Sequence, residues 1–291
     1  MNTVTQLAPE WRDWIRDNLT RGCATQSLVE DMVRNHFDPV FAAASVQDML
    51  AGMRQPAPAH DAVAAVQRDA YAYEAPRLAA GNRIHAADRV VDVAMRLERP
   101  MVAVLENLLD DGECDELIRR AAAKLRRSTI VDPVTGKHET IADRSSEGTF
   151  FPINADDFIA RLDARIAALM NLPVENGEGL QVLHYGPGGE YKPHYDYFPP
   201  NDPGSVAQMT LGGQRVSTLV MYLNEVDEGG ATVFPELGLS VVPKKGAAVY
   251  FEYANSHGQL DHRTLHAGAP VLRGEKWIVT KWMRQRRYGM A

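Results

Sequence analysis

From about residue 128 onward, short β-rich runs alternate with turns of glycine, proline and asparagine. Typical runs are "GLQVLHYG", "QRVSTLVMYLNEV" and "LSVVPKKGAAVYFEY", and a single helical stretch, "DDFIARLDARIAALMNL", interrupts them. Many short strands without interleaved helices are typical of an antiparallel sandwich or barrel. A doubly wound parallel sheet needs a helix between successive strands, so this pattern argues against it. We therefore expect an α+β chain whose larger part is mainly β.

The first part of the chain has a different, helical pattern. "PEWRDWIRDNLTRG" places Trp11, Trp14 and Ile15 at helical spacing, and "TQSLVEDMVRNHFD" repeats the arrangement. An Ala/Pro-rich stretch from Arg54, "RQPAPAHDAVAAV", indicates a linker. "AADRVVDVAMRLERP" is expected to be helical and to end at Pro100. We expect an N-terminal helical region over 1–97, which packs as a cap, dimerises or recognises a protein substrate.

The second domain is expected to span 98–291. It opens with a β-like run, "MVAVLENLL", and continues into "DDGECDELIRRAAAKLRRS". In that segment acidic residues come early and basic residues late, which the helix dipole favours. We therefore expect an amphipathic helix directly after the first strand of the domain.

Charge and cysteine content narrow the class of protein. The net charge of −7 across 291 residues argues against a nucleic-acid partner. Two cysteines rule out a disulfide framework. Near Met1 there is no apolar stretch of the kind a signal peptide has, and no run reaches the roughly 18 apolar residues of a membrane helix. The expectation is a soluble, cytoplasmic protein without a membrane partner; its oligomeric state stays open.

The segment "EYKPHYDYFPP" carries His194 and Asp196 two residues apart. In an extended strand these side chains point to one face, about 7 Å apart, so both can bind one ion. A third ligand is offered by His262 or His266 in "DHRTLHAGAPVLRGEKW", and strand parity permits either. Two histidines and one carboxylate with open positions form the facial triad of non-haem iron(II) oxygenases. The alternatives are a polar patch on a surface strand and a catalytic acid/base pair.

Lys276 lies in "EKWIVTKWM", on the same strand face as Ile278 and Trp282. If that face points inward, an ammonium group is buried among apolar residues, which is costly unless an anion meets it. A dicarboxylate bound to the metal at one end would supply that anion at its other end. This indicates 2-oxoglutarate as a co-substrate.

Several segments together resemble one known family. These are "SSEGTFF", "LQVLHYGPGGEYKPHYDYF", "GGQRVSTLVMYLNEVDEGGATVFPE", "VPKKGAAVYF" and "TLHAGAPVLRGEKW" followed by "KWM". They are similar to the prolyl 4-hydroxylase group of Fe(II)/2-oxoglutarate dioxygenases, and specifically to its small bacterial members. The resemblance covers about residues 98–288. It implies a double-stranded β-helix, which is a cupin-like jelly roll, with supporting helices.

The resemblance also assigns roles to residues. It implies iron ligands at His194, Asp196 and His266, and it places Lys276 on the distal carboxylate of 2-oxoglutarate. By the same resemblance, Tyr185 contacts the co-substrate and Thr232 is a polar residue near it. Tyr191 and Arg215 match positions that face a bound peptide. Residues 144–148 match a mobile loop that closes over the substrate.

The implied activity is that of a 2-oxoglutarate-dependent dioxygenase, similar to procollagen-proline 4-dioxygenase. It consumes O₂ and 2-oxoglutarate, releases succinate and CO₂ and hydroxylates a C–H bond, with ascorbate as a possible reductant. The expected substrate is a peptidyl proline. Two alternatives stay open: hydroxylation of a small molecule or of a different amino-acid residue, and a cupin-like metal-binding protein without catalysis. A metal store has no need for Lys276 and Tyr185, so these residues argue against the last.

Overall fold

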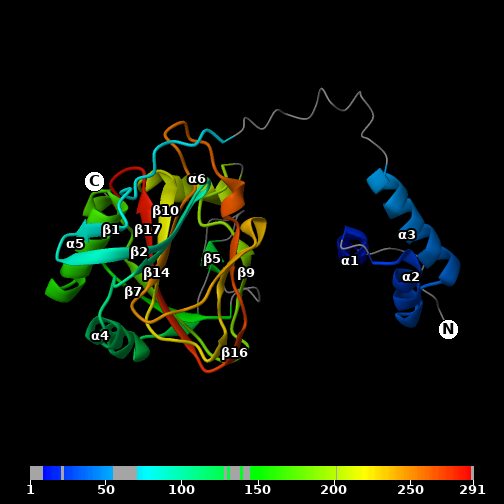
Figure 1. Cartoon of the computed structure of the whole chain (residues 1–291), viewed down its shortest axis with the longest axis horizontal. Helices are drawn as coiled ribbons and strands as arrows, with labels where there is room; N and C mark the ends of the chain where they lie inside the picture. Colours follow the sequence, from blue (N-terminus) through cyan, green and yellow to red (C-terminus); the bar gives the residue numbers. More distant parts are fainter. Residues whose placement is uncertain are drawn as a thin grey trace. The chain divides into compact units, whose positions relative to one another are not determined.

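The computed structural model describes residues 9–20, 23–54, 71–127, 130–131, 138–139, 145–200 and 202–289. The chain forms two compact units, Met1–Ala70 and Tyr71–Ala291 (Figure 1). This division falls before the boundary at 97/98 that the sequence pattern favoured. Within the described residues, no helix is both long enough and apolar enough to span a membrane.

The N-terminal unit contains three helices among its described residues: α1 (Pro9–Thr20), α2 (Thr25–Arg34) and α3 (Pro39–Arg54). The first two match the helices expected from the sequence. Their buried core is formed by Ile15, Leu28, Met32, Phe37, Ala42 and Val46. Trp11 and Trp14 pack edge to face beside this core, with ring centroids 5.1 Å apart. The expected linker after Arg54 lies outside the described residues.

The helix expected over 86–100 is wrong, because this segment forms strands. β1 (Arg83–Ala86) and β2 (Arg89–Glu98) form a hairpin, and β2 also pairs with β3 (Met101–Glu106). A two-residue loop joins the hairpin strands, with Ala87 in the left-handed region at φ 52°. Pairing on both sides outweighs the helical spacing, and the β-branched valines in "RVVDV" suit a strand. The hairpin therefore belongs to the second unit, which explains the earlier division of the chain.

The second unit is built from two main sheets among its described residues. The larger has nine strands in the order β1-β2-β3-β14-β10-β17-β8-β7-β4, and the smaller has four in the order β13-β12-β15-β9. Neighbouring strands in both sheets pair antiparallel. The remaining bounds in the larger sheet are β14 (Ala248–Glu252), β10 (Arg215–Tyr222), β17 (Lys276–Arg284), β8 (Leu180–Tyr185), β7 (Glu147–Phe151) and β4 (Arg126–Arg127). The smaller sheet comprises β13 (Leu239–Val241), β12 (Thr232–Phe234), β15 (His266–Gly268) and β9 (Tyr191–His194).

Two further strand pairs flank these sheets: β11 (Glu228–Gly229) with β16 (Val271–Arg273), and β5 (Ile130–Val131) with β6 (His138–Glu139). Several neighbouring strands are distant in sequence: β3 pairs with β14, and β8 with β17. A large and a small antiparallel sheet connected in this way form the jelly roll that the family resemblance implied. The fold is mixed α+β and mainly β.

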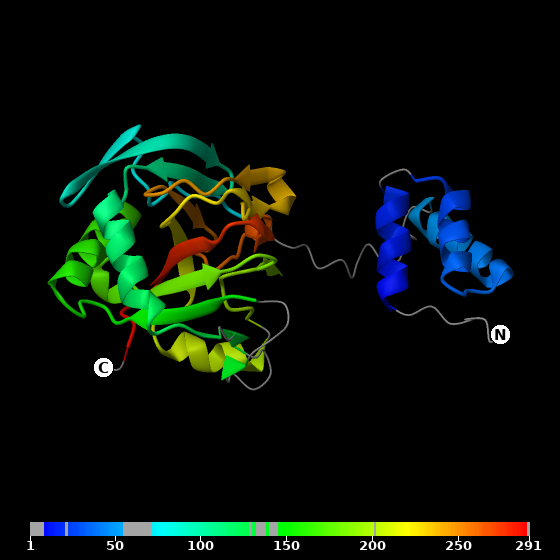
Figure 2. The ribbon, with the colours of Figure 1, turned by 90° about the horizontal axis from the view of Figure 1, so that it is seen from below.

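Helices α4 (Asp111–Ala122) and α5 (Asp157–Met170) support the larger sheet, and α6 (Pro203–Thr210) precedes β10. Figure 2 shows α4 and α5 on the same side of the unit. Helix α4 begins with a capping box, in which the Asp110 side chain accepts a hydrogen bond from the Glu113 N–H and the Glu113 side chain accepts one from the Asp110 N–H. The amphipathic helix expected from the acidic start and basic end of this segment is therefore confirmed.

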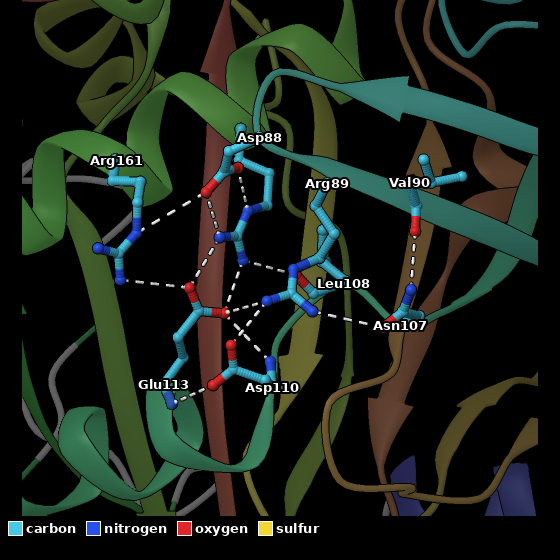
Figure 3. Close-up of polar contacts among 9 residues, drawn as sticks. Asp88, Arg89, Val90, Asn107, Leu108, Asp110, Glu113 and Arg161 are labelled. Atoms are coloured by element: carbon cyan, nitrogen blue, oxygen red, sulfur yellow. Dashed lines mark hydrogen bonds and ion pairs between the residues drawn. The ribbon is translucent and has the colours of Figure 1, made fainter.

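A buried ionic cluster joins these helices to the hairpin (Figure 3). Arg165 of α5 and Glu113 of α4 are 1% and 5% exposed, and two N–H···O contacts of 2.7 Å join them. Arg165 also donates two hydrogen bonds of 2.7 Å to Asp88, in the β1–β2 loop, and one of 2.9 Å to the carbonyl of Leu108. One guanidinium thus fixes three elements relative to one another.

We expect Arg165→Ala to lower the free energy of unfolding by about 3–5 kcal/mol, because it leaves the buried Glu113 carboxylate without its main partner. Chemical denaturation followed by circular dichroism measures this change. Arg119→Ala is the control, since Arg119 pairs with Glu116 at the surface and exposed pairs contribute little. Equal midpoints for the two variants would contradict the role given to the cluster.

Candidate functional site

The structure brings His194, Asp196 and His266 together. His194 ends β9, His266 opens β15, and the two residues face each other in the antiparallel register of these strands. One ligand atom from each of the three residues lies within 4.8 Å of the others. His262, the other candidate third ligand, lies outside this group, and its Nδ1 is 2.8 Å from the Tyr197 hydroxyl.

Both imidazole rings are oriented by backbone carbonyls. Nδ1 of His194 lies 2.8 Å from the carbonyl of Lys192, and Nδ1 of His266 lies 3.0 Å from the carbonyl of Thr264. If each Nδ1–H donates to its carbonyl, the lone pair of each Nε2 is directed at the shared centre. Nε2 of His194 is 3.8 Å from one carboxylate oxygen of Asp196, and Nε2 of His266 is 3.5 Å from the other.

The carboxylate of Asp196 is held in its ionised form. Burial acts to raise its pKa, but the adjacent His266 and His194, then Arg215 and the hydroxyl of Thr218, bring the pKa below its ordinary value. Two imidazole nitrogens and one ionised carboxylate oxygen, gathered at one point, are the donor set of a non-haem iron(II) site. The residues present therefore fit an iron(II) ion.

Two hydroxyl groups behind Asp196 were not foreseen from the sequence. Thr218 of β10 donates a hydrogen bond of 2.7 Å to Asp196 Oδ2, and the Tyr253 hydroxyl lies 3.0 Å from Thr218 Oγ1. Both residues are fully buried. No local motif marks them, because β10 and the end of β9 meet only in the folded jelly roll.

We expect Thr218→Val to weaken divalent metal binding by roughly 10- to 100-fold, the usual effect of removing a hydrogen-bond partner of a ligand. Titration of the metal-free protein with Mn(II), followed by electron paramagnetic resonance, measures the affinity. Thr210→Val, on exposed α6, is the matched control. If both variants bind Mn(II) like the wild type, Thr218 does not support the ligand.

Lys276 opens β17 and is 3% exposed. Burial lowers its pKa to about 8. Its Nζ lies 5.7 Å from the ring centroid of Tyr185 and 6.0 Å from that of Tyr222. In the described part of the chain no carboxylate forms an ion pair with it. A buried ammonium in this position calls for an anion from a ligand.

This ammonium lies beside the metal-binding strand. A Cβ placed on Gly268, two residues after His266, would come within 4.0 Å of Lys276 Nζ. Tyr185 is the register partner of Lys276 across β8 and β17. Thr232 of β12 accepts a hydrogen bond of 2.8 Å from the Tyr222 hydroxyl. Lys276 therefore lies beside Tyr185 and Tyr222, and Tyr222 connects it to Thr232. Contact of these residues with 2-oxoglutarate stays a prediction.

The two residues expected to face a peptide both lie against the metal ligands. The ring of Tyr191 stacks on that of His194, with centroids 3.6 Å apart. Arg215 donates hydrogen bonds of 2.6 and 2.8 Å to Glu178 and one of 3.2 Å to the backbone carbonyl of Asp196. Its guanidinium lies 3.9 Å from the ring centroid of Trp282. Contact with a substrate stays a prediction for both residues.

Of the expected mobile loop over 144–148, Arg144 lies outside the described residues, and Glu147 and Gly148 belong to strand β7, where they pair with β8 and β4. The backbone N–H and the hydroxyl of Ser145 both donate to the carbonyl of Glu190, and the N–H of Glu190 donates to the Ser145 hydroxyl. These bonds attach the end of the loop next to Tyr191, at the start of β9.

Comparison with known proteins agrees with this geometry. Residues 180–284, which include all three metal-binding candidates and Lys276, match the model of the 2OG-Fe(II) oxygenase superfamily. The chain is 42% identical over 202 residues to prolyl 4-hydroxylase 5 of Arabidopsis thaliana, covering 63% of this chain and 68% of that protein. It is 39% identical over 189 residues to prolyl 4-hydroxylase subunit alpha-1 of Mus musculus, covering 65% of this chain and 35% of the mouse protein.

A solved structure of a prolyl hydroxylase is also similar to this chain. The viral collagen prolyl hydroxylase from Paramecium Bursaria Chlorella virus-1, crystallised as a 2OG complex, aligns with a TM-score of 0.50 at 32% identity. The alignment covers 63% of this chain and 95% of the viral protein. The plant relative and the viral structure each match over more than two thirds of their own length. The chain is therefore a 2-oxoglutarate-dependent dioxygenase that belongs to the prolyl 4-hydroxylase family of 2OG-Fe(II) oxygenases.

Proposed function

We propose that this dioxygenase hydroxylates a C–H bond of peptidyl proline, consuming O₂ and 2-oxoglutarate and releasing succinate and CO₂. The observation that carries the proposal is the pairing of two features in one pocket. The three metal-binding candidates, His194, Asp196 and His266, converge within 4.8 Å, and the buried Lys276 beside them has no carboxylate partner in the described chain. A metal-chelating dicarboxylate satisfies both features at once.

The residues of the chain bind and orient the reactants. His194, Asp196 and His266 would hold the iron, which when bound supplies the oxidative chemistry of O₂ and 2-oxoglutarate. Lys276 would pair with the distal carboxylate of the co-substrate. Asp196, His266 and Lys276 are 7%, 5% and 3% exposed, and this burial strengthens the charge pair, because bulk water screens it little.

Three observations support a peptide as substrate. The plant and mouse relatives are named prolyl 4-hydroxylases, and the viral structure is titled a collagen prolyl hydroxylase. Tyr191 and Arg215, the positions expected to face a peptide, contact the metal ligands His194 and Asp196. Ser145, which belongs to the segment expected to close over a substrate, is bonded to Glu190 beside them. A substrate chain held there would present a side chain to the metal.

Succinate formation tests the proposal. Purified protein with Fe(II), O₂ and 2-oxoglutarate is expected to form succinate faster when a proline-containing peptide is added than when the same peptide has alanine in place of proline. Stimulation by a small molecule, or by the alanine peptide equally, would assign the enzyme a different substrate. Succinate at background with every substrate, together with no binding of 2-oxoglutarate to the metal-loaded protein, would contradict the oxygenase activity.

Two further expectations belong to the proposal. Ascorbate is proposed as the reductant that keeps the iron ferrous, on the ground of the family alone, and loss of turnover on omitting it is the corresponding test. A reducing, cytoplasmic location is proposed because Cys23 and Cys114 are free thiols. Fractionation of cells that express the tagged chain tests the location.

A further inference from the structure

Asp196 lies just beyond the end of a strand that has a neighbour on only one side. β9 is the edge strand of the four-stranded sheet and ends at His194. Its register with β15 covers His194 and Tyr191 and does not reach Asp196. Among the described residues, neither Asp196 nor Tyr197 nor Phe198 makes a backbone-to-backbone hydrogen bond. The second metal ligand therefore stands on a segment that no sheet holds.

The side chain of Gln214 takes the place of a neighbouring strand at this segment. The N–H of Phe198 donates to Gln214 Oε1 at 2.7 Å, and Gln214 Nε2 donates to the carbonyl of Phe198 at 2.7 Å. A carboxamide offers the same donor and acceptor as a peptide group. Gln214 thus forms with Phe198 the reciprocal pair of bonds found in an antiparallel ladder.

Gln214 is itself held rigidly. It is 7% exposed, and its own N–H donates to the side chain of Gln285 at 3.0 Å. The N–H of Arg215, the first residue of β10, donates to Gln214 Oε1 at 3.0 Å. Arg215 then reaches the carbonyl of Asp196 at 3.2 Å. Two consecutive residues at the start of β10 therefore hold the backbone on both sides of Tyr197.

We propose that Gln214 is a positioning residue for the metal ligand Asp196. By fixing Phe198 two residues further along, it restricts the backbone of the 196–198 segment, so that the carboxylate points at His194 and His266. Without these bonds the segment has to be ordered on metal binding, at a cost in conformational entropy. The inference rests on the metal centre of the proposed function. It gives a role to Gln214 of the "GGQR" segment, a residue to which the co-substrate and substrate contacts assign none.

Gln214→Met tests this role, because methionine fills a similar volume and makes neither bond to Phe198. Metal-free protein is titrated with Co(II), and the visible absorption of the bound ion gives both the affinity and the coordination. We expect roughly tenfold weaker Co(II) binding, at the lower end of the effects of changing residues that support metal ligands. We also expect an altered Co(II) spectrum, which a merely structural loss would not produce in a folded protein.

Gln259→Met is the matched control. The side chain of Gln259 also accepts a backbone N–H, from Ala72, and a side-chain amide, from Asn255, at 2.9 and 2.7 Å, but it touches neither a metal ligand nor the 196–198 segment. It is expected to lower thermal stability and to leave the Co(II) affinity and spectrum unchanged. A loss of Co(II) affinity in Gln259→Met as large as that in Gln214→Met would overturn the assignment.

If Gln214→Met does not fold, Gln214→Glu tests the positioning role of Gln214. Glutamate keeps the acceptor for Phe198 N–H and removes the donor to its carbonyl, so we expect an affinity between those of Gln214→Met and the wild type. Wild-type Co(II) affinity and spectrum in either folded variant overturn the inference. Failure of the wild type itself to bind Co(II) overturns the proposed metal centre instead, so the two failures are distinct.

Discussion

Replacing His194 by alanine is expected to reduce succinate formation from 2-oxoglutarate to the background of the reaction without enzyme. His194 supplies one of only two imidazoles in the cluster of three ligand candidates, and the two donors that remain hold a divalent ion weakly. Its ring also stacks on that of Tyr191, so the substitution opens the wall of the pocket as well. Succinate is quantified by mass spectrometry with and without added Fe(II).

His257→Ala and His262→Ala are the controls for this prediction. The His257 side chain is 67% exposed and lies outside the cluster of ligand candidates, so its removal is expected to leave turnover unchanged. His262 was the competing third ligand in the sequence, but it bonds to Tyr197 and lies outside the cluster. We expect His262→Ala to retain metal binding. Retention of full turnover by His194→Ala would rule out the assigned ligand set.

Lys276→Met is expected to weaken 2-oxoglutarate binding by at least 100-fold while metal affinity stays near that of the wild type. Removing one partner of a buried charge pair costs about 3–5 kcal/mol, and each 1.4 kcal/mol is about tenfold in affinity. Lys276 contributes no ligand atom to the metal cluster, so the effect separates co-substrate from metal. The KM for 2-oxoglutarate and the Kd for Mn(II) are the two measurements.

The same residue predicts a pH dependence. Burial lowers the pKa of Lys276 to about 8, so in the free enzyme its ammonium form is dominant below that pH and is lost above it. The KM for 2-oxoglutarate should therefore rise as pH passes 8, approaching about tenfold for each further pH unit. In Lys276→Arg, which keeps a positive charge at all these pH values, this rise should be absent.

Parallel loss of metal and 2-oxoglutarate binding in Lys276→Met would contradict the assigned role.

The sequence indicated the metal-binding residues because the patterns that mark them lie within short segments. His194 and Asp196 share a strand face through a spacing of two, and Lys276 stands out as a charge within an apolar run. Strand parity permitted either His262 or His266, the resemblance favoured His266, and the structure places His266 in the cluster opposite His194. Thr218 and Gln214 carried no signal, because their contacts with Asp196 and Phe198 join strands distant in the chain.

The helix expected over 86–100 was wrong for a related reason. The segment around "RVVDVAMRLE" fits a helix by spacing alone, and only pairing with β3 and β1 makes it a strand. Because pairing partners cannot be read from a local pattern, the domain boundary was placed too late. The strands and turns that recur over the second unit indicated an antiparallel sandwich or barrel, and the resemblance to the prolyl 4-hydroxylase family implied the jelly roll.

We propose that this metal site adds oxygen to a peptidyl proline. Tandem mass spectrometry tests this directly, on proline-containing peptides incubated with the protein, Fe(II), 2-oxoglutarate and ¹⁸O-labelled O₂. We expect a mass increase of one labelled oxygen atom located on proline, in step with succinate, and no such increase with His194→Ala. Succinate without any oxygen on proline across a broad peptide panel, or oxygen on a different residue, would contradict it.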